Sequence, residues 1–161
     1  HISLFVKWSG VVEPKTRNNT SIMTEDLFPT ILDMAGISDY KVPQTIDGKS
    51  IVPLFEGKSS SAFKDRSIIW NFPNIWGSSG PGINLNCAIR RGDWKLIYNY
   101  QTRQKELYNI PHDIGEANDL ANEYPSKVKE LSTALGNALR KMQAQRPIVA
   151  ATMKPCPWPD E

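Results

Sequence analysis

The 161 residues are enough for a domain with a sizeable hydrophobic core, and 40% hydrophobic with 22% charged residues is the composition of a globular protein. The net charge of +2, with basic residues scattered along the chain, argues against a nucleic-acid-binding protein. No apolar run approaches the roughly 20 residues that a membrane-spanning helix requires.

The first quarter of the chain predicts one strand and one helix. Residues 2–8 are apolar and aromatic, as expected for a strand covered on both faces. Residues 24–35 carry an apolar stripe at helical spacing, and Gly36 suits the left-handed position that follows a helix. Thr24 is predicted to cap this helix. Pro29 requires either a short first turn or a kink.

The middle of the chain is predicted to be loop with a single strand. Residues 38–55 carry Pro and Asp-Gly turn signals, and the serine-rich residues 56–64 are expected to be the most flexible stretch. Residues 67–72 are rich in apolar side chains and predict a strand closed by proline. A Gly/Ser/Pro loop follows over residues 74–82 and carries Trp76.

Two alternating segments predict a β-hairpin. Its strands are residues 86–90 and 94–100, joined by the turn residues Gly92 and Asp93. Residues 106–110 predict a further short strand. Together with the earlier strand, these segments predict an antiparallel sheet of about four strands.

A long helix is predicted to begin at Pro125, because proline fits the first helical position. Its apolar residues recur at helical spacing, so one face is expected to pack on the sheet: Val128, Leu131, Leu135, Ala138, Leu139 and Met142. The predicted fold class is therefore α+β. Residues 147–161 hold several prolines and are expected to form an extended tail.

Two cysteines do not make a disulfide framework. Cys87 lies in a predicted strand and is expected to be a small buried apolar side chain, whereas Cys156 is expected to be exposed in the tail. The two could pair only if the tail folds back over the sheet. Zinc is not expected, because the chain has no Cys-x-x-Cys pair and only two histidines, His1 and His112.

Four segments, taken in order, resemble the C-terminal region of the sulfatases of the alkaline-phosphatase superfamily. Residues 4–10, Leu-Phe-Val-Lys-Trp-Ser-Gly, are similar to a strand that usually ends in Trp-Pro-Gly, with Ser9 in place of the proline. Residues 24–36 are similar to the family's helix, in which Asp-aromatic-Pro-Thr precedes Ala-Gly. The loop at 47–57 and the hairpin and strand over 88–108 complete a resemblance that spans nearly the whole chain.

The resemblance implies that residues 1–64 are the terminal strand, helix and loop of a truncated catalytic α/β domain, and that residues 65–161 are the C-terminal subdomain. Sulfatases of this type use formylglycine made from Cys or Ser in C/S-x-P-x-R, with a calcium or magnesium ion, and both are expected upstream of this chain. The implied substrate is a sulfated small molecule or glycan, and the implied location is periplasmic or secreted. The chain alone is therefore expected to be inactive.

No catalytic or metal-binding residue is assigned within the chain. Cys87 begins Cys-Ala-Ile-Arg-Arg, in which Arg91 fits the fifth position of the sulfatase motif but Ile89 replaces the required proline. Asp113, Glu116 and Asn118 look like cation ligands, but acid-turn-acid segments usually cap turns and helix starts, and no cluster of Asp and Asn suits an oxygen-ligated cation.

Four residues are candidates for substrate binding: Asn71, Asn74, Trp76 and Arg90. In sugar sulfatases the loop that matches Asn71 and Asn74 often carries His residues that reach the substrate, and an Asn amide can bond a hydroxyl in both directions. The alternative is that both amides satisfy turn backbone. Trp76 either stacks on a sugar ring or packs onto the sheet. Arg90 either binds sulfate through its planar fork or is a solvated hairpin arginine.

Two other functions stay open at this point. One is a phosphodiester or phosphonate hydrolase of the same superfamily, and the other is a non-enzymatic carbohydrate-binding module. Because residues 2–8 and 27–35 would lack the neighbours that the resemblance implies, apolar surface and a strand edge should be exposed. The isolated chain is therefore expected to self-associate.

Overall fold

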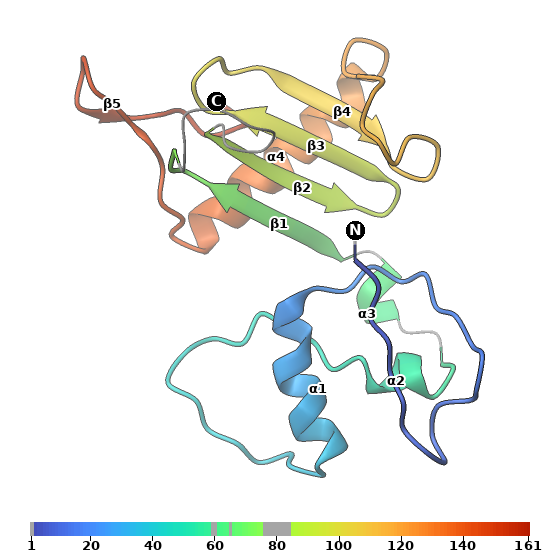
Figure 1. The fold of residues 1–161 in the computed structure, drawn as a ribbon. Coiled ribbons are helices and arrows are strands. Elements are labelled where there is room, and N and C mark those ends of the chain that lie inside the picture. The colour runs from blue at the N-terminus through green and yellow to red at the C-terminus, as the bar shows by residue number, and fades with distance from the viewer. Residues whose placement is uncertain (1, 59–60, 65, 76–84) are drawn as a thin grey trace. The chain divides into compact units, whose positions relative to one another are not determined.

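The computed structural model describes residues 2–58, 61–64, 66–75 and 85–161. The chain divides into two compact units, His1–Asp65 and Arg66–Glu161. The first unit holds short helices joined by loops, and the second holds a four-stranded sheet and a long helix (Figure 1). Within the described ranges, no helix is long and apolar enough to cross a membrane.

The main helix of the first unit begins with the 3-10 turn η1 (Thr24–Asp26) and continues as α1 (Leu27–Met34). The prediction of Thr24 as the capping residue is wrong. The turn starts after Met23, whose backbone N–H donates to the carboxylate of Asp26 at 2.8 Å. Pro29 lies in the first turn of α1, where backbone N–H groups have no helical acceptor. Gly36 has a φ of +71°, as predicted.

Two buried polar side chains attach this helix to the loop before α2 (Val52–Phe55). The second carboxylate oxygen of Asp26 accepts the backbone N–H of Lys49 at 2.8 Å. The hydroxyl of Thr30 accepts the N–H of Ile51 at 3.0 Å and donates to the carbonyl of Asp26. At Gly48, an added Cβ would lie 2.0 Å from the carbonyl oxygen of Glu25, so only glycine allows this close backbone approach.

The strand predicted over residues 2–8 is wrong, because the described part of this segment contains no strand. A strand requires a neighbouring strand that shares its backbone hydrogen bonds. The described residues of the first unit form no strand that could pair with residues 2–8. The predicted loop over residues 38–55 ends in α2, and α3 (Ser61–Lys64) lies in the stretch predicted to be most flexible. One-turn helices are too short to show an apolar period.

The second unit contains the predicted antiparallel sheet. Its strands follow the order β1-β2-β3-β4. They are β1 (Ser67–Phe72), β2 (Asn86–Arg91), β3 (Trp94–Asn99) and β4 (Lys105–Asn109). Each boundary lies within one residue of its prediction. Gly92, in the β2–β3 turn, has a φ of +57°, which glycine adopts without strain.

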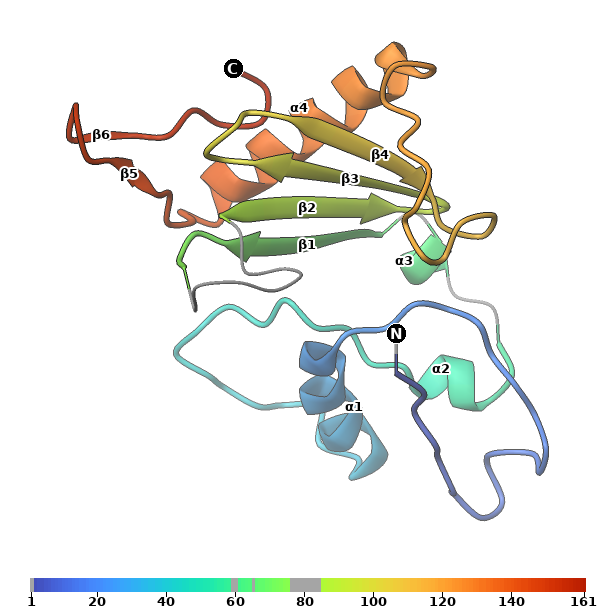
Figure 2. The same ribbon diagram turned by 45° about the horizontal axis from the view of Figure 1, so that its top comes forward.

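Helix α4 (Pro125–Lys141) lies against one face of this sheet and contacts β1, β2 and β3 (Figure 2). Because strand side chains alternate between faces, every second residue of the sheet points to the helix. The resulting core combines strand residues with one stripe of the helix: Cys87, Ile89, Leu96, Tyr98, Leu107, Leu131, Leu135 and Leu139. The α+β prediction is confirmed.

The tail after α4 folds back onto this core. It forms a small hairpin from β5 (Ile148–Val149) and β6 (Lys154–Pro155), after which Cys156 and Trp158 are buried in the same cluster. The prediction of an exposed Cys156 is therefore wrong. The physical reason is Trp158, whose large apolar ring drives the end of the tail into the core.

Charged side chains hold the end of the tail in place. The guanidinium carbons of Arg140 and Arg146 lie 5.6 Å and 4.1 Å from the centre of the Trp158 ring. Arg140 also donates two hydrogen bonds of 2.9 Å to the carboxylate of Asp160. This bidentate pairing lowers the pKa of Asp160.

Candidate substrate-binding groove

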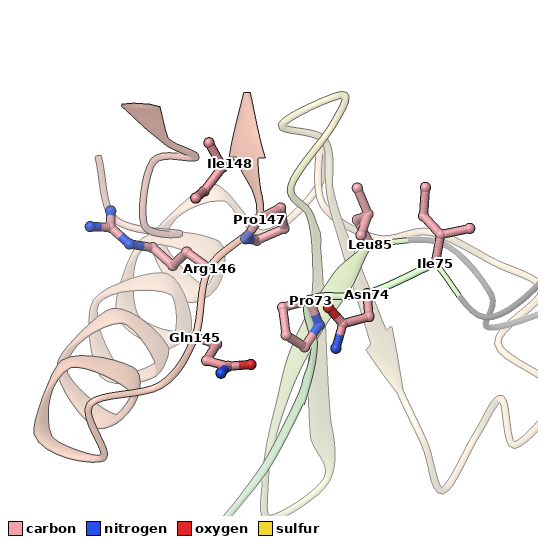
Figure 3. Close-up of a pocket in the computed structure, with 8 residues that line it drawn as sticks. All are labelled: Pro73, Asn74, Ile75, Leu85, Gln145, Arg146, Pro147 and Ile148. Carbon is pink, nitrogen blue, oxygen red and sulfur yellow. The ribbon is translucent and has the colours of Figure 1, made fainter. Parts of the chain in front are cut away.

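A groove of about 640 Å³ lies where β1 ends and the segment after α4 begins. Eight residues line it: Pro73, Asn74, Ile75, Leu85, Gln145, Arg146, Pro147 and Ile148 (Figure 3). This volume is within the range of about 300–1,000 Å³ that is common for small-ligand sites.

The groove has two walls that are far apart in sequence. Pro73, Asn74, Ile75 and Leu85 form one wall, at the ends of β1 and β2, and residues 145–148 form the other (Figure 3). The side chain of Gln145 points toward the first wall, whereas the guanidinium of Arg146 points away from it. The two carboxamides of the groove therefore belong to opposite walls.

Asn71 joins the two walls from within the sheet. Its side-chain nitrogen donates to the carbonyl of Gln145 at 2.9 Å, and its side-chain oxygen accepts the hydroxyl of Tyr100 at 2.8 Å. Both ends of the amide are thus used by the protein. These bonds fix the position from which the chain leaves α4 along the groove.

The guanidinium of Arg146 is engaged outside the groove. It donates to the carbonyl of Cys156 at 2.9 Å and stacks on the ring of Trp158. Among the described residues, the carboxylates of Asp160 and Glu161 pair with Arg140, and no carboxylate pairs with Arg146. The described lining of the groove therefore presents two amides and apolar surface.

The four predicted site residues do not all come together. Asn74 lines the groove and is exposed, whereas Asn71 does not line it and contacts it only through its hydrogen bond to the carbonyl of Gln145. Arg90 lies near the far end of β2 from the groove residue Leu85. It is four residues, and so roughly 13 Å, along the strand from Asn86. Its Nε donates to the carbonyl of Gly92 at 3.3 Å. Trp76 lies outside the described residues.

The second wall was not found from the sequence. Gln145, Pro147 and Ile148 follow the long helix in a segment whose composition suggested only an extended tail. Only the return of the tail to the core brings these residues opposite Asn74, and that return depends on long-range packing, which leaves no local periodicity. The single local signal was Trp158, an aromatic residue among prolines.

The environment of Cys87 is unsuited to thiolate chemistry. Burial raises the pKa of its thiol to about 12, and a hydrogen bond with Tyr100 offsets this only in part. A reactive cysteine needs the opposite, a lowered pKa and solvent access. Cys87 and Cys156 are both free and both belong to the core cluster.

The acidic turn after β4 is structural. The carboxylate of Asp113 accepts the N–H groups of Asn118 and Ala117, which lower its pKa. Glu116 pairs with Lys95 at 2.6 Å. The prediction that this acidic segment caps a turn is confirmed for Asp113, whereas Glu116 forms an ion pair instead. In the described ranges, no group of three or more His, Cys, Asp or Glu residues could hold a metal ion.

Comparison with known proteins places the chain in a family. Residues 1–145 match the family model described as N-sulphoglucosamine sulphohydrolase, C-terminal. The chain belongs to this sulfatase family. The C-terminal sulfatase match covers both units and ends at Gln145, the first residue of the second groove wall.

Three relatives illustrate the similarity of this sulfatase region. A sulfatase of Formosa agariphila is 30% identical over 98% of this chain and 30% of its own length. The N-acetylglucosamine-6-O-sulfatase of Bacteroides thetaiotaomicron is 26% identical over 89% of this chain and 26% of its own length. The solved structure of BT4656 in complex with its substrate D-glucosamine-2-N,6-O-disulfate is 28% identical, with a TM-score of 0.55 over 73% of this chain and 24% of that one. The chain thus spans less than a third of the length of these relatives.

Proposed function

We propose that this chain is the C-terminal region of a sulfuric ester hydrolase that acts on sulfated sugars. The observation that carries the proposal is the family match over residues 1–145, supported by 30% identity to a sulfatase across 98% of the chain. Sulfated glucosamine recurs in the family description, in one relative and in one solved complex. Sulfated amino sugars are therefore the first substrates to test.

In this proposal the reacting groups belong to the rest of the protein. The formylglycine and the calcium or magnesium ion of sulfatases would be held there, and residues 1–64 would pack with the same catalytic domain. One observation supports this division of labour: Cys87, the cysteine that begins Cys-Ala-Ile-Arg-Arg, is buried with a raised pKa. Residues 65–161 would then form a subdomain that supplies packing and substrate contacts.

Asn74 is the proposed substrate contact that the groove supports best, because its exposed amide can donate to and accept from a sugar hydroxyl. Asn71 would act in the same place mainly by positioning, since its amide already holds Gln145 and Tyr100. Trp76 and Arg90 stay predictions from sequence, as a stacking surface and a sulfate ligand respectively.

The test is hydrolysis by the complete natural protein that contains this chain. Release of inorganic sulfate from N-acetylglucosamine 6-sulfate and from an aryl sulfate is compared with release of phosphate from a phosphate monoester and a diester. The proposal predicts sulfate release, with preference for the sugar ester. Preferential release of phosphate would favour the phosphoester branch of the superfamily, and sugar binding without hydrolysis would favour a binding module.

A pair of variants ties the activity to the groove. Asn74→Ala should raise KM for the sugar sulfate about three- to tenfold, the value of one or two lost hydrogen bonds. Asn137→Ala, an exposed asparagine on α4, is the matched control and should leave KM unchanged. Equal kinetics of both variants would remove Asn74 from the proposed site.

A further inference from the structure

We infer that Tyr100 is a positioning residue for the substrate contact proposed at Asn74. Tyr100 follows β3 directly, is 1% exposed and does not belong to the lining of the groove. It can therefore act on a substrate only through the residues that it holds. The inference rests on the proposed function, since it takes Asn74 to contact the sugar, and it extends the proposed site to a buried residue behind it.

The hydroxyl of Tyr100 sets the orientation of the Asn71 amide. It donates to the side-chain oxygen of Asn71 at 2.8 Å, so the side-chain nitrogen donates to the carbonyl of Gln145 at 2.9 Å. A reversed amide would place its oxygen against that carbonyl, and two acceptors would face each other. The same hydroxyl also forms a hydrogen bond with the Cys87 thiol. Burial raises the pKa of the Tyr100 phenol well above 10.0, so the donor keeps its proton.

The backbone of Tyr100 holds the first wall of the groove at a second place. Its N–H donates to the carbonyl of Leu85 at 2.8 Å, and Leu85 belongs to that wall (Figure 3). Tyr100 thus holds the first wall directly through Leu85 and the second wall through Asn71. Its ring packs edge-on against Tyr98, with centroids 5.4 Å apart, so the hydroxyl is presented from a fixed position.

Asn71 transmits this control to Asn74 over a short and stiff link. Only Phe72 and Pro73 separate the two asparagines. Phe72 ends β1 and pairs with Asn86, which keeps its backbone extended. Proline fixes its own φ near about −65° and restricts the preceding residue to extended conformations. A shift of Asn71 therefore moves Asn74 as well, because the two residues between them cannot absorb it.

The kinetic experiment uses the complete natural protein and N-acetylglucosamine 6-sulfate. Tyr100→Phe removes the hydroxyl and keeps the ring and the backbone N–H. Tyr108→Phe is the matched control, because Tyr108 is 7% exposed and its hydroxyl donates to the carboxylate of Glu106 at 3.1 Å. Tyr108 lies on the sheet face opposite the core, since it alternates with Leu107 of the core cluster.

Tyr100→Phe should raise KM about three- to tenfold, as Asn74→Ala does, and leave kcat unchanged. In the double variant Tyr100→Phe/Asn74→Ala, KM should rise no further than in Asn74→Ala alone, because Tyr100 acts through Asn74. A merely structural role would lower stability without moving KM. Unchanged KM in Tyr100→Phe, additive increases in the double variant, or an equal increase in Tyr108→Phe overturns the inference.

Hydrogen exchange separates this inference from the proposed function. If the complete protein hydrolyses no sulfate ester, the proposed function fails, but the order of the groove residues is still measurable. Peptides covering residues 71–75 and 143–148 should exchange about three- to tenfold faster in Tyr100→Phe than in wild type. They should exchange at the wild-type rate in Tyr108→Phe. Unchanged exchange in Tyr100→Phe overturns the inference, whatever the complete protein hydrolyses.

Discussion

The carboxylate of Asp26 accepts the backbone N–H of Lys49 at 2.8 Å, across 23 positions of the sequence. The same carboxylate accepts the N–H of Met23, so one buried side chain both begins the helical segment and holds the following loop. This explains physically why an acid stands in the segment that resembles the Asp-aromatic-Pro-Thr pattern of sulfatases. Thr30, at the end of that pattern, holds the same loop through Ile51.

Asp26→Ala should lower the free energy of unfolding by about 3 kcal/mol, because two backbone N–H groups lose a charged acceptor. Asp26→Asn should cost less, since the amide oxygen still accepts one of the two bonds while its NH₂ group faces the other donor. Hydrogen exchange at the amides of Lys49 and Met23 measures the loss directly. Asp39→Ala, at an exposed position, is the control; an equal loss there would contradict the assigned role.

The hydrogen bonds of Asn71 predict a specific order of stability. Tyr100→Phe removes the hydroxyl that bonds Asn71 and also contacts the Cys87 thiol, and should cost about 1 kcal/mol in chemical denaturation. Asn71→Asp should cost more, because the Tyr100 hydroxyl keeps its acceptor but a carboxylate oxygen then faces the carbonyl of Gln145. If Asn71→Asp were as stable as wild type, the amide would not be joining the two walls of the groove.

The sheet and the long helix followed from the sequence because their signals are local. Alternation of apolar residues, the Gly92 turn and Pro125 each act within a few positions, and the predicted strands differ from the observed ones by at most one residue. The strand over residues 2–8 was predicted from apolar content alone. A strand also needs a partner, and the described part of the first unit supplies none.

Only one of the two walls of the groove could be predicted from the sequence. Asn71 and Asn74 sit where a strand meets a loop, which is a recognisable place for substrate contacts. The opposite wall depends on Trp158 returning to the core, with two arginines beside its ring. Such a return depends on packing between residues far apart in sequence, and the composition of the tail concealed it. The same return explains why Cys156 is buried rather than exposed.

Stability should fall as the solution becomes alkaline. Burial raises the pKa of Cys87 from 9.0 to about 12, so the folded protein keeps a proton that the unfolded chain loses. The contribution of the thiol is complete below about pH 9 and is lost as the pH rises toward about 12. Burial also raises the pKa of Tyr98, Tyr100 and Tyr108, which act in the same direction above pH 10.0.

Urea denaturation at a series of pH values checks this dependence. The free energy of unfolding of the wild type should decrease between about pH 9 and pH 12, and that of Cys87→Ala should decrease less steeply over the same range. In parallel, iodoacetamide should modify Cys87 slowly in the folded protein and quickly in urea. Rapid labelling of the native thiol, or identical slopes for wild type and Cys87→Ala, would refute the burial argument.

The 161-residue chain should self-associate through the first unit. Phe5 and Ile31 are 91% and 63% exposed, and α1 adds the partly exposed Leu27, Phe28 and Met34. Apolar surface of this kind usually marks an interface. Sedimentation velocity should show a mass that rises with concentration, and Ile31→Glu should shift the distribution toward monomer. Ser38→Glu introduces the same charge in an exposed loop and should not. A strictly monomeric wild type at all concentrations would contradict this account.

The central claim is that this chain serves a sulfatase without carrying the reacting groups. It is tested most directly by measuring inorganic sulfate released from N-acetylglucosamine 6-sulfate by the complete natural protein and, separately, by the purified 161 residues. The account predicts release by the complete protein and none by the 161 residues. Sulfate release by the 161 residues alone, free of contaminating enzyme, or phosphate release in place of sulfate release by the complete protein, would contradict it.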